Sequence, residues 1–302
     1  GFSMPMHFVF VTDSHHYPDA PEDFSAPKIL TQSRRVLDAM PVAINALNPD
    51  FIVHGGDLLC GGSSFKMPWE TYIRAVGEVA SACSLFQAPT YYVPGNHDSD
   101  AQQASFDLFA QHIPIPQILD VVDAGPRWRL AVANVYHDCS PISEAAGVWT
   151  EALDQALRNA ARTAEADGRA LILALHPWVV PHASQQDNPK PHGVIFEAAR
   201  IQETIKTHPA IMMILTGHYH RNRISLFHGC LILDTACLIG YPMGFRDIWI
   251  EDNGTFRTRF HALDLPDVIE ASYARSTPEE NAVWAGRSED RDAEMRLPRW
   301  RE

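Results

Sequence analysis

Short polar segments rich in aspartate and histidine recur along the chain, and their side chains are of the kinds that bind metal ions. Five segments stand out: Asp13-Ser14-His15, Gly56-Asp57, Gly95-Asn96-His97-Asp98, His176 and Gly217-His218-Tyr219-His220. Carboxylate, amide and imidazole groups together suit Mn, Fe, Zn, Ni or Co, and the segments offer no thiolate. The D-x-H and H-x-H spacings would turn both side chains of a pair to one side if the backbone is extended. The sequence therefore predicts a site for two metal ions.

Each polar segment follows a run of apolar residues that is typical of a buried strand. The runs lie at residues 7–11, 51–53, 91–93, 171–175 and 211–215. In sheets covered by helices, binding groups collect beyond the carboxyl ends of the strands, so segments about 200 residues apart can meet there. We therefore expect a single site at the strand ends.

Helices and further strands are predicted between and after these segments. Helical periodicity covers residues 29–47, 69–83, 150–166 and 194–206. Short alternating strands follow His220 and indicate a meander, at residues 223–227, 231–234, 247–251 and 255–261. Between the last two, Asn253-Gly254 favours a hairpin turn over a glycosylation site. This mixture predicts an α/β (α+β) chain with two sheets packed face to face and helices outside both.

The order of the five segments resembles that of the calcineurin-like metallophosphoesterase superfamily, whose motifs run D-x-H, G-D, G-N-H-D/E, a lone H after an apolar strand, and G-H-x-H. All five motifs occur here in that order, and the resemblance covers residues 6–262. It implies a four-layer αββα sandwich of two mixed sheets flanked by helices, with a dinuclear metal site at the carboxyl ends of the strands. Within the superfamily, the chain is most similar to the bacterial cyclic-nucleotide phosphodiesterase-like branch.

The resemblance also implies a role for each matching residue. One metal ion would be held by Asp13, His15 and His220 and the other by Asn96, His176 and His218, with Asp57 bridging the two through its two oxygens. A metal-bound hydroxide would be the nucleophile, because the ions lower the pKa of bound water. His97 is expected to act as general acid or phosphate clamp, so Asp57 and His97 are the predicted catalytic residues. Asp98 is expected to accept a hydrogen bond from a histidine ring in the second shell of the metals.

Other residues near these segments give weaker signals. His16 is a predicted substrate contact, with a surface-loop role as the open alternative, and His54 within a strand favours packing over an active-site role. Cys60 occupies the position where purple acid phosphatases have tyrosine, so a ferric-phenolate site is not expected. Cys60 is instead expected to be a small buried residue. Six further histidines carry no spacing signal and are not expected to be ligands: His7, His112, His137, His208, His228 and His261.

Irregular segments are expected to decide substrate choice and assembly. Three such loops follow polar segments, at residues 16–28, 60–68 and 177–193. The third is the predicted lid and carries Lys190, a predicted substrate contact, with a solvated lysine as the alternative. The catalytic domain is expected at residues 1–264. Residues 265–302 form a polar tail that is predicted to be a capping or oligomerisation arm, or else disordered.

Composition limits the compartment and the partners. The 302 residues, 46% of them hydrophobic, suffice for a sizeable core, and the net charge of −13 argues against long nucleic acids. The five cysteines lack C-x-x-C spacing, which predicts reduced thiols in a cytoplasmic protein. The N-terminal apolar stretch is too short for a signal peptide or membrane span, so no membrane partner is expected. Residues 1–3 before Met4 suggest an expression remnant, which leaves a removed leader open.

Together these features predict a metal-dependent phosphoric ester hydrolase. The favoured substrate is a small phosphodiester such as a 3′,5′-cyclic nucleotide. A phosphomonoesterase or a nucleotide pyrophosphatase is the alternative, because all three share the same site chemistry. A non-catalytic scaffold with the same fold is disfavoured, because every ligand position and His97 are filled.

Overall fold

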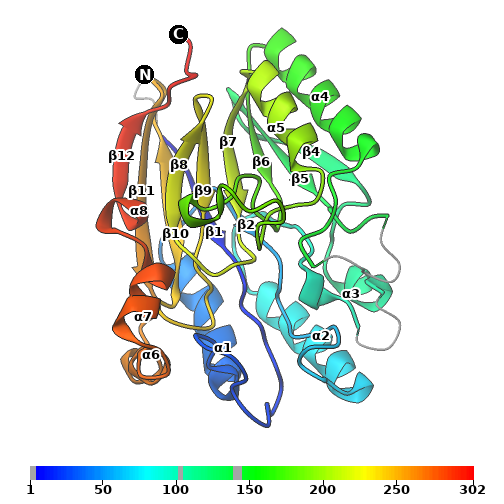
Figure 1. Ribbon diagram of the computed structural model, residues 1–302, viewed down its shortest axis with the longest axis vertical. Coiled ribbons are helices and arrows are strands. Elements are labelled where there is room, and N and C mark those ends of the chain that lie inside the picture. The colour runs from blue at the N-terminus through cyan, green and yellow to red at the C-terminus, as the bar shows by residue number, and fades with distance from the viewer. Residues whose placement is uncertain (1–4, 101–104, 139–144) are drawn as a thin grey trace.

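Two six-stranded sheets form the centre of the molecule (Figure 1). A computed structural model describes residues 5–100, 105–138 and 145–302 of the chain. In spatial order, the first sheet contains β12 (Ala293–Arg296), β11 (Thr255–Ala262), β10 (Gly244–Ile250), β1 (Met6–Val11), β2 (Phe51–His54) and β3 (Thr90–Tyr92). The second contains β4 (Leu119–Gly125), β5 (Trp128–Ala133), β6 (Ala170–Ala174), β7 (Ile211–Thr216), β9 (Cys230–Asp234) and β8 (Arg223–Phe227).

Both sheets are mixed, and their parallel strands supply the site. β1, β2 and β3 run parallel to one another in the first sheet, while β10, β11 and β12 are antiparallel neighbours. In the second sheet β5, β6, β7 and β9 are parallel, and β4 and β8 pair antiparallel at its edges. The carboxyl ends of the parallel strands within each sheet therefore lie at one edge.

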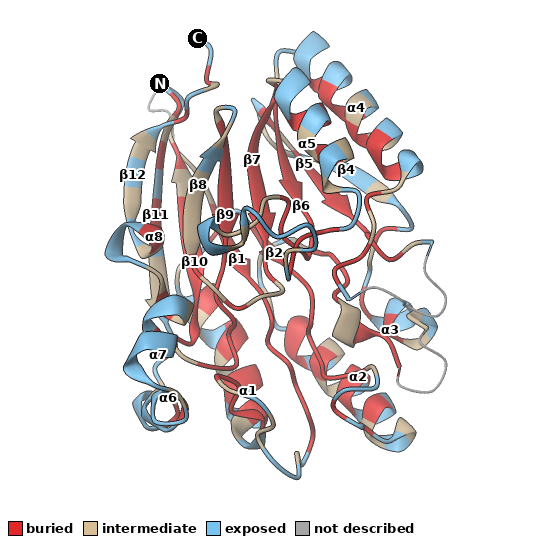
Figure 2. Cartoon of the chain, viewed as in Figure 1, coloured by how far each residue is buried: buried red, intermediate tan, exposed pale blue. Residues whose placement is uncertain are grey.

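Helices cover the outer face of each sheet, which confirms the predicted four-layer αββα sandwich. α1 (Ser33–Asn45) and α2 (Trp69–Cys83) pack on the first sheet, with α3 (Asp107–His112) beside α2. α4 (Glu151–Ala166) and α5 (Ala198–Thr207) pack on the second sheet. Along β1, Val9 and Val11 face the helices, while Phe8 and Phe10 enter the core between the sheets. Figure 2 shows this buried centre and the exposed outer faces of the helices.

The predicted helices are confirmed, with one shifted start and one divided segment. The segment at 29–47 forms a 3₁₀ turn, η1 (Leu30–Gln32), followed by α1. α5 begins at Ala198, whereas helix was predicted from residue 194. Val194 instead pairs with Trp178 in a β-bridge, and Glu197 adopts a left-handed φ of 62°, so tertiary contacts override the local helical period.

The predicted meander after His220 is wrong, because its strands divide between the two sheets. β8 and β9 form a hairpin in the second sheet, while β10 and β11 form a hairpin in the first. The hairpin turn at Asn253-Gly254 is confirmed: Gly254 has a φ of 83° and lies directly before β11. β4 and β5 were not predicted.

The tail folds against the rest of the chain. It contains α6 (Pro266–Tyr273), α7 (Pro278–Ala285), α8 (Ser288–Arg291) and β12, which extends the first sheet beyond β11. Trp300 is buried and stacks on Trp128, closing one end of the core between the sheets. Ser272 of α6 donates a hydrogen bond to the carbonyl of Pro27. A domain boundary at residue 264 and an oligomerisation role both stay predictions.

Two further features bear on compartment. Cys60, Cys83, Cys230 and Cys237 are buried and free, while Cys139 lies outside the described residues. In the described ranges, no helix has the length and apolar character needed to cross a bilayer. The cytoplasmic location stays a prediction.

Candidate active site

Tight backbone turns at the strand ends carry most of the predicted ligands. Asp13 and His15 after β1 have φ values of 54° and 42°, and His218 and His220 after β7 have φ values of 74° and 59°. The extended backbone that was the condition for the side chains of each pair to point the same way is therefore not present. Left-handed φ values are costly for residues with a Cβ and are found mainly where function requires them.

The first group that could hold a metal ion consists of Asp13, His15 and His220. Asp13 Oδ1 lies 3.1 Å from His220 Nε2 and 3.5 Å from His15 Nε2, and the two ring nitrogens are 3.3 Å apart. All three side chains are buried. Three donor atoms thus converge on one point, as predicted from the motifs.

The second group consists of Asp57, His176 and His218. His176 Nε2 lies 3.1 Å from Asp57 Oδ2 and 3.2 Å from His218 Nδ1. The same Asp57 oxygen is 3.6 Å from His15 Nε2 of the first group. Asp57 Oδ2 therefore faces both groups, which is the position a bridging ligand requires.

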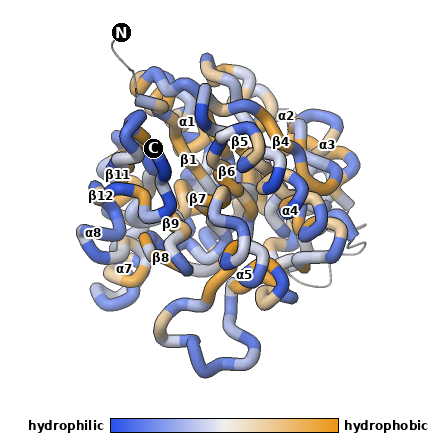
Figure 3. Tube along the Cα trace, turned by 90° about the horizontal axis from the view of Figure 1, so that it is seen from above, coloured by the Kyte–Doolittle hydropathy of each residue, from blue (hydrophilic) through white to orange (hydrophobic). Residues whose placement is uncertain are grey.

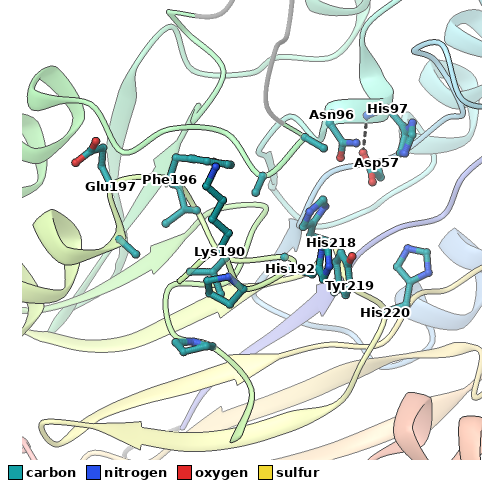
Figure 4. Close-up of a pocket in the computed structure, with 18 of the residues that line it drawn as sticks. Asp57, Asn96, His97, Lys190, His192, Phe196, Glu197, His218, Tyr219 and His220 are labelled. Carbon is teal, nitrogen blue, oxygen red and sulfur yellow. Dashed lines mark hydrogen bonds between the residues drawn. The ribbon is translucent and has the colours of Figure 1, made fainter. Parts of the chain in front are cut away.

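Each aspartate is oriented by its other oxygen. Asp57 Oδ1 accepts a hydrogen bond from the His97 backbone N–H at 2.8 Å (Figure 4), and Asp13 Oδ2 accepts one from the His218 N–H at 3.0 Å. Of the two Asp57 oxygens, only Oδ2 is left facing both groups, and the bridging role of Asp57 stays a prediction. A Cβ at Gly95 would lie 2.1 Å from Asp57 Oδ1, so only glycine fits there.

Asn96 supplies the remaining predicted donor. Its Oδ1 is buried and forms no hydrogen bond in the described part of the chain. Buried polar atoms are almost always paired, so an unpaired acceptor beside two groups of metal-binding type fits a metal ion. Figure 4 shows Asn96 beside Asp57.

His97 lies next to the two groups and has one defined tautomer. Its Nδ1 donates to the carbonyl of Gly61 at 2.9 Å, so Nε2 remains available, and the side chain lines the cavity over the site. Burial lowers the pKa of His97, and Lys28 acts in the same direction. The position suits the predicted role next to the reacting group.

Asp98 does not contact a histidine ring, so that part of its prediction is wrong. Its Oδ2 accepts from the backbone N–H groups of Asp57 and Gly95 at 2.9 and 2.8 Å. Its Oδ1 accepts from those of Leu58 and Leu59 at 2.8 and 3.2 Å. Burial and the nearby Asp57 raise the pKa of this carboxyl to about 8, while the hydrogen bonds from the backbone N–H groups of Gly95 and Leu59 lower it. Four N–H donors occupy its two oxygens, which leaves no room for a ring. Asp98 thus fixes the backbone that carries Asp57.

Two of the histidines predicted as ligands have lowered pKa values, which favour the neutral form. Burial lowers the pKa of His15 to about 4, and burial together with the nearby His176 lowers that of His218 to about 3. A neutral imidazole has a free lone pair, which is the form that binds a metal ion.

The other two histidines hold a proton in the absence of metal. Burial disfavours a cationic His176, but Asp57 outweighs this effect and raises its pKa to about 9. Burial also disfavours a cationic His220, while Cys237 and Asp13 raise its pKa to about 10. These raised pKa values favour the protonated form of one histidine in each group.

His54 and His16 lie near the site but are turned elsewhere. His54 Nδ1 accepts from the Gly56 N–H at 3.1 Å and Nε2 lies 3.1 Å from Ser14 Oγ, so it supports the turns at two ligand segments, in line with packing. His16 is fully buried and contacts Ser33 Oγ at 3.1 Å, away from the cavity. The structure therefore does not bring His16 to a substrate. In the described residues, none of the six other histidines joins either group.

Cys60 lies behind His15, one of the predicted ligands. It is fully buried, and its Sγ is 3.7 Å from His15 Nδ1 and donates to the His15 carbonyl at 3.3 Å. The predicted small buried residue is confirmed, and its contact with His15 was not foreseen.

A cavity of about 790 Å³ opens over the two groups. Part of its wall is apolar and belongs to residues 189–198, and the predicted contact Lys190 lies on this wall (Figure 4). The exposed loop that carries Lys190 projects beside α5 (Figure 3). Lys28 and Phe65 also line the cavity, on the metal side, where the Phe65 ring packs against the rings of His15 and His97. Both lie in loops that were predicted to decide substrate choice, residues 16–28 and 60–68, but neither residue was singled out, because these loops contain no motif.

Solved structures with this fold include enzymes and an anchor protein. A dimetal phosphatase from Danio rerio is similar over 86% of this chain and 97% of its own, with a TM-score of 0.69 and 13% identity. A purple acid phosphatase from yellow lupin (Lupinus luteus) is similar over 86% and 52%, with a TM-score of 0.59 and 12% identity. GAP50, the anchor in the inner membrane complex of Plasmodium, is similar over 94% and 97%, with a TM-score of 0.51 and 12% identity. No curated protein matches the chain.

The family assignment rests on the sequence itself. A model of the calcineurin-like phosphoesterase family matches residues 6–222, a span that includes all five polar segments. The chain therefore belongs to the calcineurin-like phosphoesterase family. The family and the two groups of metal-binding side chains support a metal-dependent phosphoester hydrolase. The bacterial cyclic-nucleotide phosphodiesterase-like branch stays a prediction.

Proposed function

We propose that this protein hydrolyses a small phosphate ester at a dinuclear metal site. The observation that carries the proposal is the position of Asp57 Oδ2, which lies 3.1 Å from His176 Nε2 and 3.6 Å from His15 Nε2. A single anionic oxygen facing both donor groups is suited to two cations held side by side. The proposed ligands of one ion are Asp13, His15 and His220, those of the other are Asn96, His176 and His218, and Asp57 is shared.

The chemistry divides between the ions and the chain. When bound, two ions supply Lewis acidity, which activates water and neutralises charge on the phosphoryl oxygens. As a general acid, His97 would need a second proton on Nε2, because its Nδ1–H is donated to the Gly61 carbonyl; it would pass the Nε2 proton to the leaving oxygen and return to the neutral form. Burial disfavours this cationic form, and the neighbouring Asp57 favours it. Asp98 keeps Asp57 in place through the backbone. The metal can be any of Mn, Fe, Zn, Ni or Co, since oxygen and imidazole donors suit all of them.

The cavity supports an organic group on the substrate. Its wall at residues 189–198 includes Pro191, Val194, Ile195 and Phe196, together with Tyr219 from the last metal segment. Such a wall suits a nucleoside or another ring system, so the first substrate to test is a small phosphodiester such as a 3′,5′-cyclic nucleotide. The Lys28 ammonium on the metal side favours a second candidate class, phosphomonoesters and nucleotide pyrophosphates, which carry more negative charge.

A scaffold without catalysis is the remaining alternative. GAP50 has this fold and is described as an anchor, so the fold alone does not require hydrolysis. Here, however, two complete groups of metal-binding side chains are present and His97 lines the cavity. These residues favour the enzyme.

The proposal is tested by the Mn-dependent hydrolysis of bis(p-nitrophenyl) phosphate and p-nitrophenyl phosphate. We expect activity that chelation removes, and a loss of about 10²- to 10⁴-fold in His97→Ala with metal content unchanged, because general acid catalysis contributes about that much. A higher rate on the diester would support a phosphodiesterase, and a higher rate on the monoester a phosphatase. Inactivity on both substrates would contradict the proposed hydrolysis of simple esters.

Metal binding is expected to release protons. His176 and His220, with pKa values raised to about 9 and 10, each hold a proton at neutral pH that a metal ion must displace. We therefore expect about one proton released per ion, and an apparent affinity that rises with pH up to these pKa values and falls as pH decreases. Calorimetric titration with Mn²⁺ in buffers of different ionisation enthalpy measures the release. A release of no protons at neutral pH would contradict these ligand assignments.

A further inference from the structure

Lys28 is a buried cation on the metal side of the cavity. Its side chain is 8% exposed and lines the cavity together with His15, Asp57 and His97. Lysine is among the residues least often buried, because removing an ammonium group from water is costly unless it is paired. Its position therefore requires an explanation.

The partners of Lys28 within the chain are neutral. Its Nζ donates to Ser25 Oγ at 2.9 Å and lies 5.6 Å from the centre of the Phe65 ring. In the described residues, no carboxylate forms an ion pair with it. A hydroxyl and an aromatic face only partly replace water around an ammonium group. The cation thus lacks an anionic partner in the protein alone.

Lys28 does not serve to balance the charge of the metal ligands. The nearby carboxylates, Asp13 and Asp57, face the donor groups, and two divalent ions would already outweigh them. A lysine beside these ions increases the positive potential of the cavity. Positive potential focused in a cleft attracts anionic ligands.

The backbone around Lys28 is fixed by distant segments. Lys28 forms an isolated β-bridge with Gly240, and the N–H of Ile29 donates to the carbonyl of Ile239 at 3.0 Å. A Cβ at Gly240 would lie 2.3 Å from the carbonyl oxygen of Pro27, so the backbone segments at Pro27 and Gly240 approach each other closely. The backbone of Lys28 is therefore fixed beside the cavity, and the hydrogen bond to Ser25 Oγ and the Phe65 ring position its ammonium group, as a built binding group requires.

We infer that Lys28 forms a subsite for a second negative charge on the substrate, next to the phosphorus that reacts. The inference rests on the proposed function, in which the metal ions take the first charged oxygens of the phosphoryl group. Two substrate classes share the required chemistry: a phosphomonoester, with both charges on one phosphoryl group, and a pyrophosphate-linked ester, with the second charge on the neighbouring phosphate. A simple diester with one charge gains little from this subsite.

Binding of small anions to the Mn-loaded protein tests the subsite without turnover. Calorimetry compares inorganic phosphate with dimethyl phosphate on wild type, Lys28→Met, Lys28→Arg and a control, Lys206→Met. Lys206 is an exposed lysine in the last turn of α5 and does not line the cavity. We expect Lys28→Met to weaken the binding of inorganic phosphate about tenfold or more, in line with the loss of a charge-assisted contact, and that of dimethyl phosphate far less. Lys28→Arg should retain most of the affinity, and Lys206→Met all of it. Equal affinity of wild type and Lys28→Met for phosphate would overturn the inference.

Thermal unfolding and hydrolysis distinguish the remaining outcomes. Lys28→Met should not lower the melting temperature, because it removes an unpaired buried charge, whereas a purely structural lysine would lower it. If Lys28→Met lowers kcat/KM selectively for p-nitrophenyl phosphate, the second charge lies on the reacting phosphoryl group. If it lowers kcat/KM selectively for UDP-glucose, the second charge lies on the neighbouring phosphate. An equal loss on these and on bis(p-nitrophenyl) phosphate would refute charge selection. If the wild-type protein hydrolysed none of these three substrates, the proposed function would be refuted. The effect of Lys28→Met on the affinity for inorganic phosphate would still decide the role of Lys28.

Discussion

Asp57→Asn is expected to abolish hydrolysis and to lower the metal content from two ions per chain to one or fewer. Asp57 Oδ2 faces both donor groups, while Oδ1 accepts from the His97 N–H. If the asparagine keeps its oxygen toward His97, its NH₂ group points at both cations. If the amide is instead flipped, its NH₂ group faces the His97 N–H, so that two donors meet, and the oxygen that would face both cations belongs to a neutral group. Either way the two cations lose their shared anion, and we expect kcat to fall on the order of a thousandfold, or about 4 kcal/mol.

Elemental analysis and steady-state kinetics on the same samples check this result. Asp252→Asn is the matched control, because Asp252 is exposed in the hairpin between β10 and β11 and should leave metal content and rate unchanged. Circular dichroism establishes that the Asp57 variant is folded. A folded Asp57→Asn protein with two ions and full activity would show that another group bridges the metals.

The meeting of the polar segments could be predicted, because it follows from a general property of parallel strands. A buried apolar strand precedes each of Asp13, Asp57, His176 and His218. The carboxyl ends of these strands converge whatever the conformation of the loops that follow them. The division of ligands into two groups came from the family resemblance. The orientation of the aspartates could not be predicted, since it depends on single backbone N–H groups, such as that of His97, that have no signature in the sequence.

Features that depend on contacts between distant segments were missed. Lys28 resembles any loop lysine in the sequence, and only the close approach of Gly240 to Pro27 shows that it is held at the cavity. Trp300 stands among charged residues in the sequence, yet it stacks on Trp128 inside the core. Local periodicity reports which face of an element is apolar, but it does not report which partner covers that face.

Asp98→Asn is expected to cause the largest loss of stability of the substitutions considered, about 3 to 5 kcal/mol, because two buried backbone N–H groups lose their acceptor at a cost of about 1 to 3 kcal/mol each. Each oxygen of Asp98 accepts from two backbone N–H groups, those of Asp57 and Gly95 on one side and those of Leu58 and Leu59 on the other. An asparagine must present its NH₂ group to one of these pairs, whichever way it is turned. Two hydrogen bonds are then lost and two buried N–H groups face another donor.

Chemical denaturation of the metal-free protein measures this effect without a contribution from bound ions. Asp38→Asn is the control: this aspartate pairs with Arg34 at the surface, where an ion pair contributes about 0.5 kcal/mol or less. The metal-loaded Asp98 variant should also bind its ions more weakly, since the backbone of Asp57 loses its anchor. A loss of stability in Asp98→Asn no larger than that of Asp38→Asn would mean that the turn carrying Asp57 is held by its own backbone geometry, and that the four hydrogen bonds to Asp98 are replaceable by water.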